Sequence, residues 1–394
     1  MNNKVIIWGV DDYNTLALIR QVGQLACDVH FLVIGKAKYA AYSKYCTLYV
    51  ESSNIENGFD ILVNNYANEP KRPIIITNGD DVITFIDKHR LELEKLFILP
   101  GCRTQGDTEY YIDKYNMTNL AEQCGIDVPK SWFINKSSSI DNIIYPCFIK
   151  PSHQKPGHYN EFKFKLCKNK SDLVNTLRYV REDSVFIVQQ YIEREKDLLV
   201  YGCRMPDGKI EIAGGLVTDR FAVGQGSSYG MVSSTAHPSI DCDKIRLFLD
   251  KIDYVGLFSF EYGLMNGVAY FFEINMRNDG TSHFFFDAGA NLPGAYVLAS
   301  SGKSYSNCSV KVQKQCTYMD DIYDISNVVL GNVTMSQWKV QRQSIGAYKF
   351  YNEDDPQPYD IARKGKWLRI IRDIILKKFR VYVLFVLDRL GFRK

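Results

Sequence analysis

The amino-acid sequence predicts a mixed fold, α/β and α+β, with a small N-terminal parallel α/β domain, a larger α+β unit and a C-terminal amphipathic helix. Three observations support this fold class. Short apolar runs alternate with helical patterns over residues 1–105, and hairpin patterns follow over 106–305. The last residues, 366–394, combine basic side chains with apolar residues at helical spacing. Residues 306–365 have a weaker pattern and are expected to form an extension.

Composition narrows the function. The 394-residue chain has a net charge of +3 and ten cysteines, none of them in a CxxC pair. So small a charge does not point to nucleic acid as a partner, and we interpret the cysteines as reduced thiols of a cytoplasmic protein. The apolar run at the N-terminus is too short for a signal peptide, and no stretch reaches the roughly 20 apolar residues that span a bilayer.

The first domain is predicted from three buried-strand patterns: KVIIWGV (4–10), DVHFLVIG (28–35) and RPIIIT (72–77). Gly9 follows the first strand, but the sequence after it lacks the other glycines of a dinucleotide-binding turn. The third strand ends in NGDD (78–81). At the carboxyl end of a parallel strand Asp80 would face a ligand, here a substrate. The alternative is a solvated helix start.

The second unit is predicted to contain helices and antiparallel strands. The turn residues PDG (206–208) and NG (266–267) indicate two hairpins. The expected order is a helix (108–129), a strand (145–152), a helix (171–182), a strand (185–192), two strands (198–217), a helix (244–254) and a hairpin (256–275).

Polar residues gather at the end of that last hairpin, in FFEINMRNDG (271–280). Alternation places Glu273, Asn275 and Arg277 on one face of the strand. If the hairpin turns at 266–267, Glu261 lies nearly opposite Glu273. Two carboxylates and an amide oxygen are ligands for a hard cation such as Mg²⁺, whose shell water and phosphate oxygens would complete. The alternative is two surface carboxylates with an asparagine in a turn.

Two lysines fit a phosphate beside that cation. Lys150 ends the apolar strand in FIKPS, where a buried ammonium needs an anion. Lys114, in IDKYN, lies near the start of a helix rich in polar groups. Most lysines are merely solvated, so either residue alone is weak evidence.

Taken together, these residues resemble the ATP-grasp enzymes. The segments that carry the resemblance are DKYNMTNLAEQCGIDVP, YPCFIKPS, VQQYIEREKDLLV and FSFEYGL followed by FFEINMRNDG, and they cover about 105–300. The resemblance implies two α+β subdomains that clamp ATP, with a lid over about 134–200, and ATP and Mg²⁺ as cofactors. The preceding α/β domain fits the family's usual N-terminal partner.

The resemblance also implies roles for single residues. Lys114 and Lys150 would contact ATP phosphates, and Arg277 would steady the transferred phosphoryl group. Asp197, or alternatively Glu195, would bind the ribose hydroxyls. The magnesium ligands would be Glu261, Glu273 and Asn275, and the adenine would be held by Gln189 and the backbone of Gln190, Tyr191 and Ile192.

Two positions depart from the family pattern. The loop after the second lysine, PSHQKPGHYNEF, contains only Gly157, where relatives often carry a glycine-rich phosphate loop. Backbone donors would have to cap the phosphates there. Gln189 stands where many relatives have an acid, and an amide can both accept from and donate to adenine.

The reaction implied by the resemblance is a ligation: ATP activates a carboxylate as an acyl phosphate, and an amine attacks it. Arg220, in a polar loop, is the candidate cation for the substrate carboxylate; a solvated arginine is the alternative. His283 is a candidate contact for the amine substrate, with a structural histidine as the alternative. The substrates would be small molecules or glycans that carry a carboxylate and an amine.

The tail indicates a further partner. Residues 363–380 contain eight basic side chains and one acid, Asp373, while Trp367, Ile370, Ile371, Ile374, Ile375 and Phe379 share one helical face. A basic amphipathic helix with tryptophan is typical of a membrane surface. It would place the protein on the inner face of the cytoplasmic membrane with a lipid-linked substrate, as in the assembly of a capsular polysaccharide or another envelope glycan. Packing on the protein itself and an oligomer contact are the alternatives.

Three classes of function therefore remain open. The first is a carboxylate–amine ligase, acting on an envelope glycan or its precursor, or on a free dipeptide or small metabolite. The second is a catalytically inactive nucleotide-binding relative, and the third is a membrane-bound scaffold.

Overall fold

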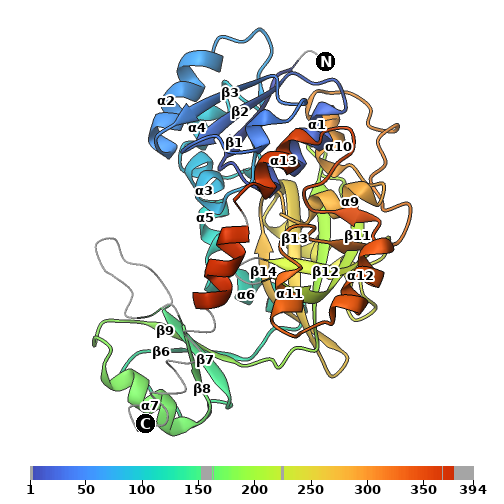
Figure 1. Ribbon diagram of the computed structural model, residues 1–394. Coiled ribbons are helices and arrows are strands. Elements are labelled where there is room, and N and C mark those ends of the chain that lie inside the picture. The colour runs from blue at the N-terminus through green and yellow to red at the C-terminus, as the bar shows by residue number, and fades with distance from the viewer. Residues whose placement is uncertain (1–2, 152–161, 163, 223–225, 366, 377–394) are drawn as a thin grey trace.

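The computed structural model describes residues 3–151, 162, 164–222, 226–365 and 367–376. Its N-terminal part is the parallel α/β arrangement that the sequence predicts (Figure 1). Four parallel strands form a sheet in the order β3-β2-β1-β4. These strands are β1 (Val5–Gly9), β2 (Val29–Ile34), β3 (Leu48–Ser52) and β4 (Ile74–Thr77), with helices α1 (Tyr13–Gly23), α2 (Ile55–Tyr66) and α3 (Asp80–Lys88) between and after them.

A larger, mainly antiparallel sheet forms the body of the molecule, in the order β14-β13-β10-β11-β12-β15-β16. Its last two strands pair in parallel and lie beyond residue 305, so the extension expected over 306–365 continues this sheet. The strands are β10 (Lys196–Arg204), β11 (Ile210–Phe221), β12 (Ser227–Ser233), β13 (Tyr254–Met265), β14 (Val268–Asn275), β15 (Cys316–Met319) and β16 (Ala347–Tyr348), and the short β5 (Gly101–Cys102) pairs with β13.

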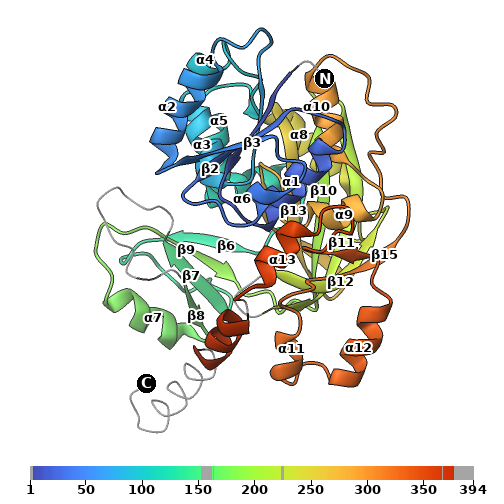
Figure 2. The same cartoon turned by 45° about the horizontal axis from the view of Figure 1, so that its top comes forward.

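A third sheet lies at the lower left of Figure 1, away from the N-terminal sheet, with helix α7 (Lys170–Arg178) on it, and Figure 2 shows the same sheet and helix from a second direction. It has a hydrophobic core of its own, which includes Ile149, Leu173 and Val188. Its strand order is β6-β9-β7-β8, from β6 (Ser131–Ile134), β7 (Cys147–Pro151), β8 (Lys165–Cys167) and β9 (Phe186–Gln190). We refer to residues 131–190 as the lid. The predicted limits, 134–200, differ because β6 begins earlier and 196–200 belong to β10 of the large sheet.

The helix expected over 108–129 is divided in two. Helix α5 (Asp107–Ile112) ends at Asp113, whose extended backbone breaks the helix, and the Asp113 side chain then caps α6 (Lys114–Gln123). The remaining helical elements are η1 (Ala40–Tyr42), α4 (Arg90–Leu93), α8 (Cys242–Lys251), α9 (Ser282–Asp287), α10 (Leu292–Ser300), α11 (Ser326–Val329), α12 (Met335–Gln343) and α13 (Gln357–Arg363).

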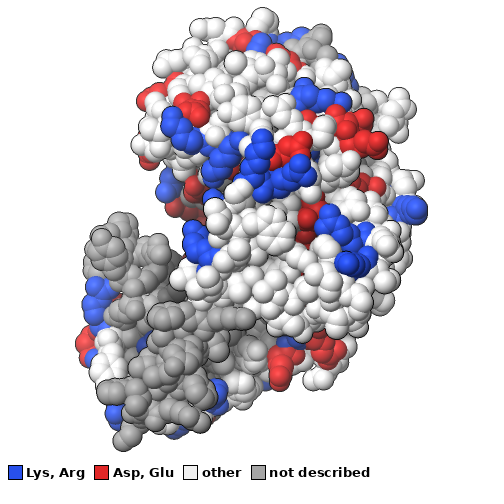
Figure 3. All heavy atoms as spheres, viewed as in Figure 1, with Lys and Arg blue, Asp and Glu red and all other residues white. Residues whose placement is uncertain are grey.

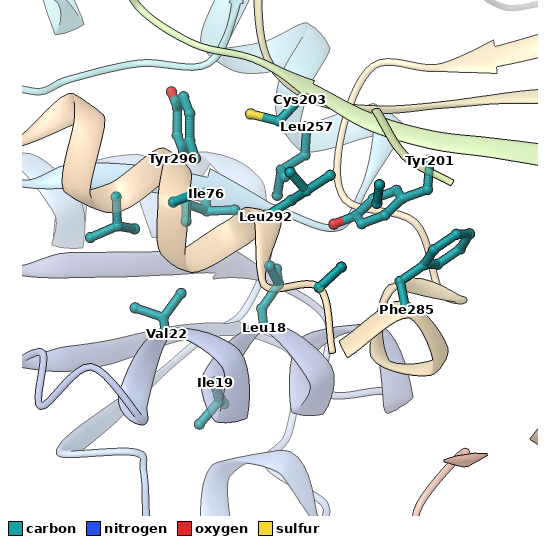
Figure 4. Packing of buried hydrophobic residues seen from close by; sticks show 14 of the residues in the cluster. Leu18, Ile19, Val22, Ile76, Tyr201, Cys203, Leu257, Phe285, Leu292 and Tyr296 are labelled. Carbon is teal, nitrogen blue, oxygen red and sulfur yellow. The ribbon is translucent and has the colours of Figure 1, made fainter. Parts of the chain in front are cut away.

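One hydrophobic core joins the N-terminal sheet to the body. Leu18 and Val22 of α1 belong to the same buried cluster as Leu292 of α10 and Tyr201 of β10 (Figure 4). The C-terminal extension is tied to the same helix, because Arg20 forms an ion pair of 2.9 Å with Asp355, a carboxylate that is itself buried. The N-terminal domain is therefore packed firmly against both later parts of the chain.

The tail begins as a helix over 367–376, which we call the C-terminal helix; residues 366 and 377–394, including Phe379, lie outside the described residues. Ile370 and Ile374 are buried against the protein, whereas Trp367, Ile371 and Ile375 are exposed. Part of the apolar face predicted for the membrane therefore packs on the protein itself. Among the described residues, no helix has the length and apolarity needed to cross a bilayer.

Positive and negative side chains lie close together over much of the face in Figure 3. This mixture is consistent with the small net charge of the whole chain.

Candidate active site

A cavity of about 420 Å³ lies where the N-terminal domain, the large sheet and the C-terminal extension meet. It collects polar side chains from segments far apart in the sequence. These include Asp12, Tyr13 and Asn78 from the N-terminal domain, Arg194 and Asp197 near the start of β10, Glu261, Glu273 and Asn275 from the last hairpin, Arg277 and Asp279 after it, and Lys349 after β16.

The hairpin β13–β14 brings the two predicted acids together. It turns at Asn266 and Gly267, both with positive φ, as the NG sequence predicts. The resulting register pairs Glu261 directly with Glu273. Asn275 lies on the same wall and donates from Nδ2 to Glu261 Oε1 at 2.9 Å.

The charges of these side chains suit a divalent cation. Burial and the neighbouring Glu273 raise the pKa of Glu261 to about 8. Ionising Glu261 while Glu273 is also charged is therefore unfavourable. A cation bound between them would remove that conflict. Within the described parts of the chain no cluster of three or more His, Cys, Asp or Glu could hold a metal. This set has two carboxylates and an amide, which fits an ion that keeps open positions for water or phosphate oxygens.

Lys150 and Lys114 approach the same acids from the lid and from α6. Lys114 Nζ lies 3.0 Å from Glu273 Oε2. Lys150 points from β7, with Nζ 3.3 Å from Gln189 Oε1. Burial and the charge of Lys114 lower the pKa of Lys150 to about 8. Because the charged form of this partly buried lysine is destabilised, an anionic ligand bound beside it would stabilise the ammonium.

The segment expected to hold adenine and ribose lies where the lid joins the body. Gln189 and Gln190 end β9, and the Tyr191 amide donates to the Pro146 carbonyl at 2.9 Å. Asp197 lines the cavity and pairs with Arg194 at 3.0 Å. The alternative ribose ligand, Glu195, instead accepts a hydrogen bond from the Asn266 amide at the hairpin turn.

Arg277 lines the cavity and is held in place by two neighbours. Its Nε lies 3.0 Å from Asp80 Oδ1, and its Nη2 donates to Asn275 Oδ1 at 2.8 Å. Asp80 follows β4 in the first turn of α3 and contacts Arg277, but it is not among the residues that line the cavity.

Arg220 does not line the cavity, in contrast to the substrate role expected for it. Its guanidinium forms two hydrogen bonds, of 2.8 and 3.3 Å, with Asp324, whose side chain is fully buried, and it stacks on Tyr229. A third bond reaches Gln341 Oε1 at 2.9 Å. The guanidinium therefore already has a carboxylate partner within the chain.

His283 is buried, but neither of its ring nitrogens makes a geometrically sound hydrogen bond to a described residue, so it is not the satisfied structural histidine that was the alternative. It is buried in α9, its ring lies 4.0 Å from that of Phe284, and it is not among the cavity-lining residues. Burial lowers the pKa of His283 well below its ordinary value, so the imidazole is neutral. It does not contact the space in which an amine substrate would bind.

Several cavity residues were missed at the sequence level. Asp12 and Tyr13 lie three and four residues after the end of β1, and their place at the carboxyl end of a parallel strand was the available signal. Lys349 had no such signal, since it comes from the segment with the weakest pattern. The loop around Gly157 lies outside the described residues.

Comparison with known proteins agrees with this architecture. No family model matches the chain. A D-aspartate ligase of Enterococcus faecium is 22% identical over 68% of this chain and 73% of its own. An N5-carboxyaminoimidazole synthetase from Staphylococcus aureus, complexed with ADP, superposes with a TM-score of 0.64 at 16% identity, covering 85% of this chain and 87% of its own.

An L-amino acid ligase from Bacillus licheniformis superposes with a TM-score of 0.60 at 13% identity, over 80% of this chain and 79% of its own. The two structural superpositions cover 85% and 80% of this chain. The chain therefore has the ATP-grasp fold that its motifs predict.

Proposed function

We propose that this protein is an ATP-dependent ligase that activates a carboxylate as an acyl phosphate and joins it to an amine. The observation that carries the proposal is the single wall formed by Glu261, Glu273 and Asn275, with Lys114 and Arg277 in contact with it. The names of the three similar proteins support the same reaction class, since two are ligases and one is a synthetase complexed with ADP.

Each side chain has a task in such a reaction. Bound magnesium would neutralise charge on the ATP phosphates. Lys114 and Lys150 would donate to phosphate oxygens, and Arg277 would stabilise the phosphoryl group as its charge spreads in the transition state. Asp197 would accept from ribose hydroxyls. The lid would exclude water, which otherwise hydrolyses an acyl phosphate.

The carboxylate and amine would occupy the cavity beyond the acids, beside Asp12 and Lys349. An amino-acid substrate is supported by the D-aspartate and L-amino acid ligases among the similar proteins. The more specific proposal is that the amino acid is joined to an envelope glycan or its lipid-linked precursor. Its support is the exposed apolar side of the C-terminal helix, with Trp367 and Ile371 beside Arg372.

Hydroxylamine provides a direct test, because this small amine captures any acyl phosphate as a hydroxamate. Purified protein with ATP and Mg²⁺ would be incubated with D- and L-amino acids and uronic acids in turn. At least one carboxylate should give hydroxamate together with equimolar ADP. ATP cleavage without hydroxamate from any carboxylate, or no ATP cleavage at all, would contradict the ligase proposal.

A further inference from the structure

The end of the cavity beyond the acids is walled by residues from both ends of the chain. Tyr13 is the first residue of α1, and Lys349 follows β16. Both line the cavity, and the Lys349 ammonium lies 3.9 Å from the centre of the Tyr13 ring. We call these two residues the substrate wall.

Lys349 is fixed from behind. Its Nζ lies 3.0 Å from Asp320 Oδ2, and the two side chains are only 2% and 0% exposed. Burial lowers the pKa of Lys349, but the charge and hydrogen bond of Asp320, together with Tyr13 and Asp321, outweigh it, so the pKa is raised and the ammonium stays charged. A charged ammonium held in this way attracts the face of the Tyr13 ring.

Tyr13 is confined on its other side. A Cβ atom added at Gly280 would lie 2.6 Å from Tyr13 Cε2, so the ring lies directly against that backbone. Gly280 itself lines the cavity, three residues after Arg277. The ring therefore fills the space between the C-terminal extension and the segment that follows the predicted metal ligands.

The C-terminal helix supports this wall. Ile370 and Ile374 are buried in one cluster with Phe350 and Ala222, and Tyr13 packs against that cluster. Phe350 directly follows Lys349, and its ring makes an edge contact with the Tyr13 ring at 6.1 Å. Ala222 directly follows Phe221, another lining residue. Each of these contacts connects the helix to the cavity.

We propose that Tyr13 and Lys349 contact the carboxylate or amine substrate and that the C-terminal helix positions them through Ile370 and Ile374. This inference rests on the ligase function proposed above. The side chains expected to hold the ATP phosphates and the metal have their polar contacts elsewhere: Lys114 contacts Glu273, Lys150 contacts Gln189, and Glu261 contacts Asn275. Displacing the helix should therefore weaken substrate binding and leave nucleotide binding intact.

The test compares two pairs of substitutions on the same helix. Ile370→Asp with Ile374→Asp places charges in the buried cluster, whereas Ile371→Asp with Ile375→Asp changes two exposed neighbours. KM would be measured for the carboxylate that yields hydroxamate, and the affinity for ADP with Mg²⁺ by calorimetry. We expect KM to rise about tenfold or more in the buried pair only, with ADP affinity within about twofold of the original.

Ile370→Leu with Ile374→Leu should keep the original KM, because the cluster stays apolar. Ile370→Ala with Ile374→Ala is the milder pair to use if the aspartates prevent folding. Tyr13→Leu should raise KM without any change in the helix. An unchanged KM in the buried pairs, or equal changes in the buried and exposed pairs, would overturn the inference.

Hydrogen exchange separates this inference from the ligase proposal, since it needs no substrate. Amides of residues 11–16 and 346–351 should exchange faster in the buried-pair variants than in the exposed-pair variant. If no carboxylate yields hydroxamate, the ligase proposal fails, whatever the exchange rates are. If the exchange rates of these segments do not change in the buried-pair variants, the inference that the C-terminal helix positions Tyr13 and Lys349 fails.

Discussion

The pKa values of Lys150 and Glu261 are both shifted to about 8, so the charged form of each side chain is less stable here than in water. Burial is the first cause in each case, and a like charge is the second: Lys114 for the lysine and Glu273 for the glutamate. An anion bound near Lys150 would stabilise its charged form, and a cation bound near Glu261 would stabilise the ionised carboxylate. A magnesium–phosphate ligand would satisfy both, which is the residue-scale argument for nucleotide in this cavity.

The lowered pKa of Lys150 predicts a pH dependence. Between about 8 and its ordinary value of 10.5, the unfolded chain binds a proton at this lysine that the folded chain lacks. The contribution of Lys150 to the stability of the apo protein should therefore rise with pH through that window, while the buried cysteines, whose pKa values are raised, act in the opposite direction. ATP affinity should fall over the same range, because the phosphates require the charged form. Urea unfolding and calorimetry at pH 7.5, 8.5 and 9.5 would measure both, and Lys150→Met should remove both trends.

Glu273→Gln tests the predicted metal ligand. The change keeps the size of the side chain and removes its charge, so we expect turnover to fall on the order of 100-fold with the fold retained. Steady-state ADP release and circular dichroism would check the two parts. Glu109→Gln, which changes a partly exposed glutamate of α5 paired with Lys88, is the matched control, and turnover equal to that of the control would reject the assignment.

At the scale of elements, hydrophobic pattern and turn chemistry predicted most of the site. The NG turn set the register that pairs Glu261 with Glu273, and the apolar strands placed Lys150 at the end of β7. Arg220 shows the limit of such reasoning. A sequence shows that a guanidinium is available but not that a buried carboxylate 104 residues later, Asp324, already binds it. Lys349 was missed for the same reason, because its place in the cavity depends on tertiary packing.

The Arg220–Asp324 pair should matter for stability, since it ties β11 to the segment that leads into α11. Arg220→Met would leave a fully buried carboxylate without its cation, at a cost of about 3 kcal/mol in the free energy of unfolding. Arg363→Met, which removes an exposed pair with Asp360, should change it by less than about 0.5 kcal/mol. Urea titrations would measure the free energy of unfolding of both variants. Similar losses in the two variants would show that Arg220 does not stabilise the buried Asp324 carboxylate.

At the scale of the whole molecule, the C-terminal helix has one side packed on the protein and the other exposed. Leu368 and Trp367 are 76% and 61% exposed, and Arg369 and Arg372 lie between and beside the apolar residues. Removal of residues 366–394 should therefore abolish binding to anionic vesicles while ADP binding persists. Vesicle flotation at low and high salt would measure the binding to vesicles. A full-length variant with Ile371→Asp and Ile375→Asp is the control, and it should also fail to bind the vesicles. Flotation of the truncated protein would contradict the surface role of the tail.

The hydrophobic core that α1 shares with α10 and β10 affects how the molecule unfolds. Because those helices and strands bury one another, residues 1–105 are not a module that can be excised, although the sequence gives them the outline of a domain. The N-terminal sheet and the body should lose their structure in one cooperative transition. The lid has its own core around Leu173 and Val188, so we expect it to unfold locally before that transition begins.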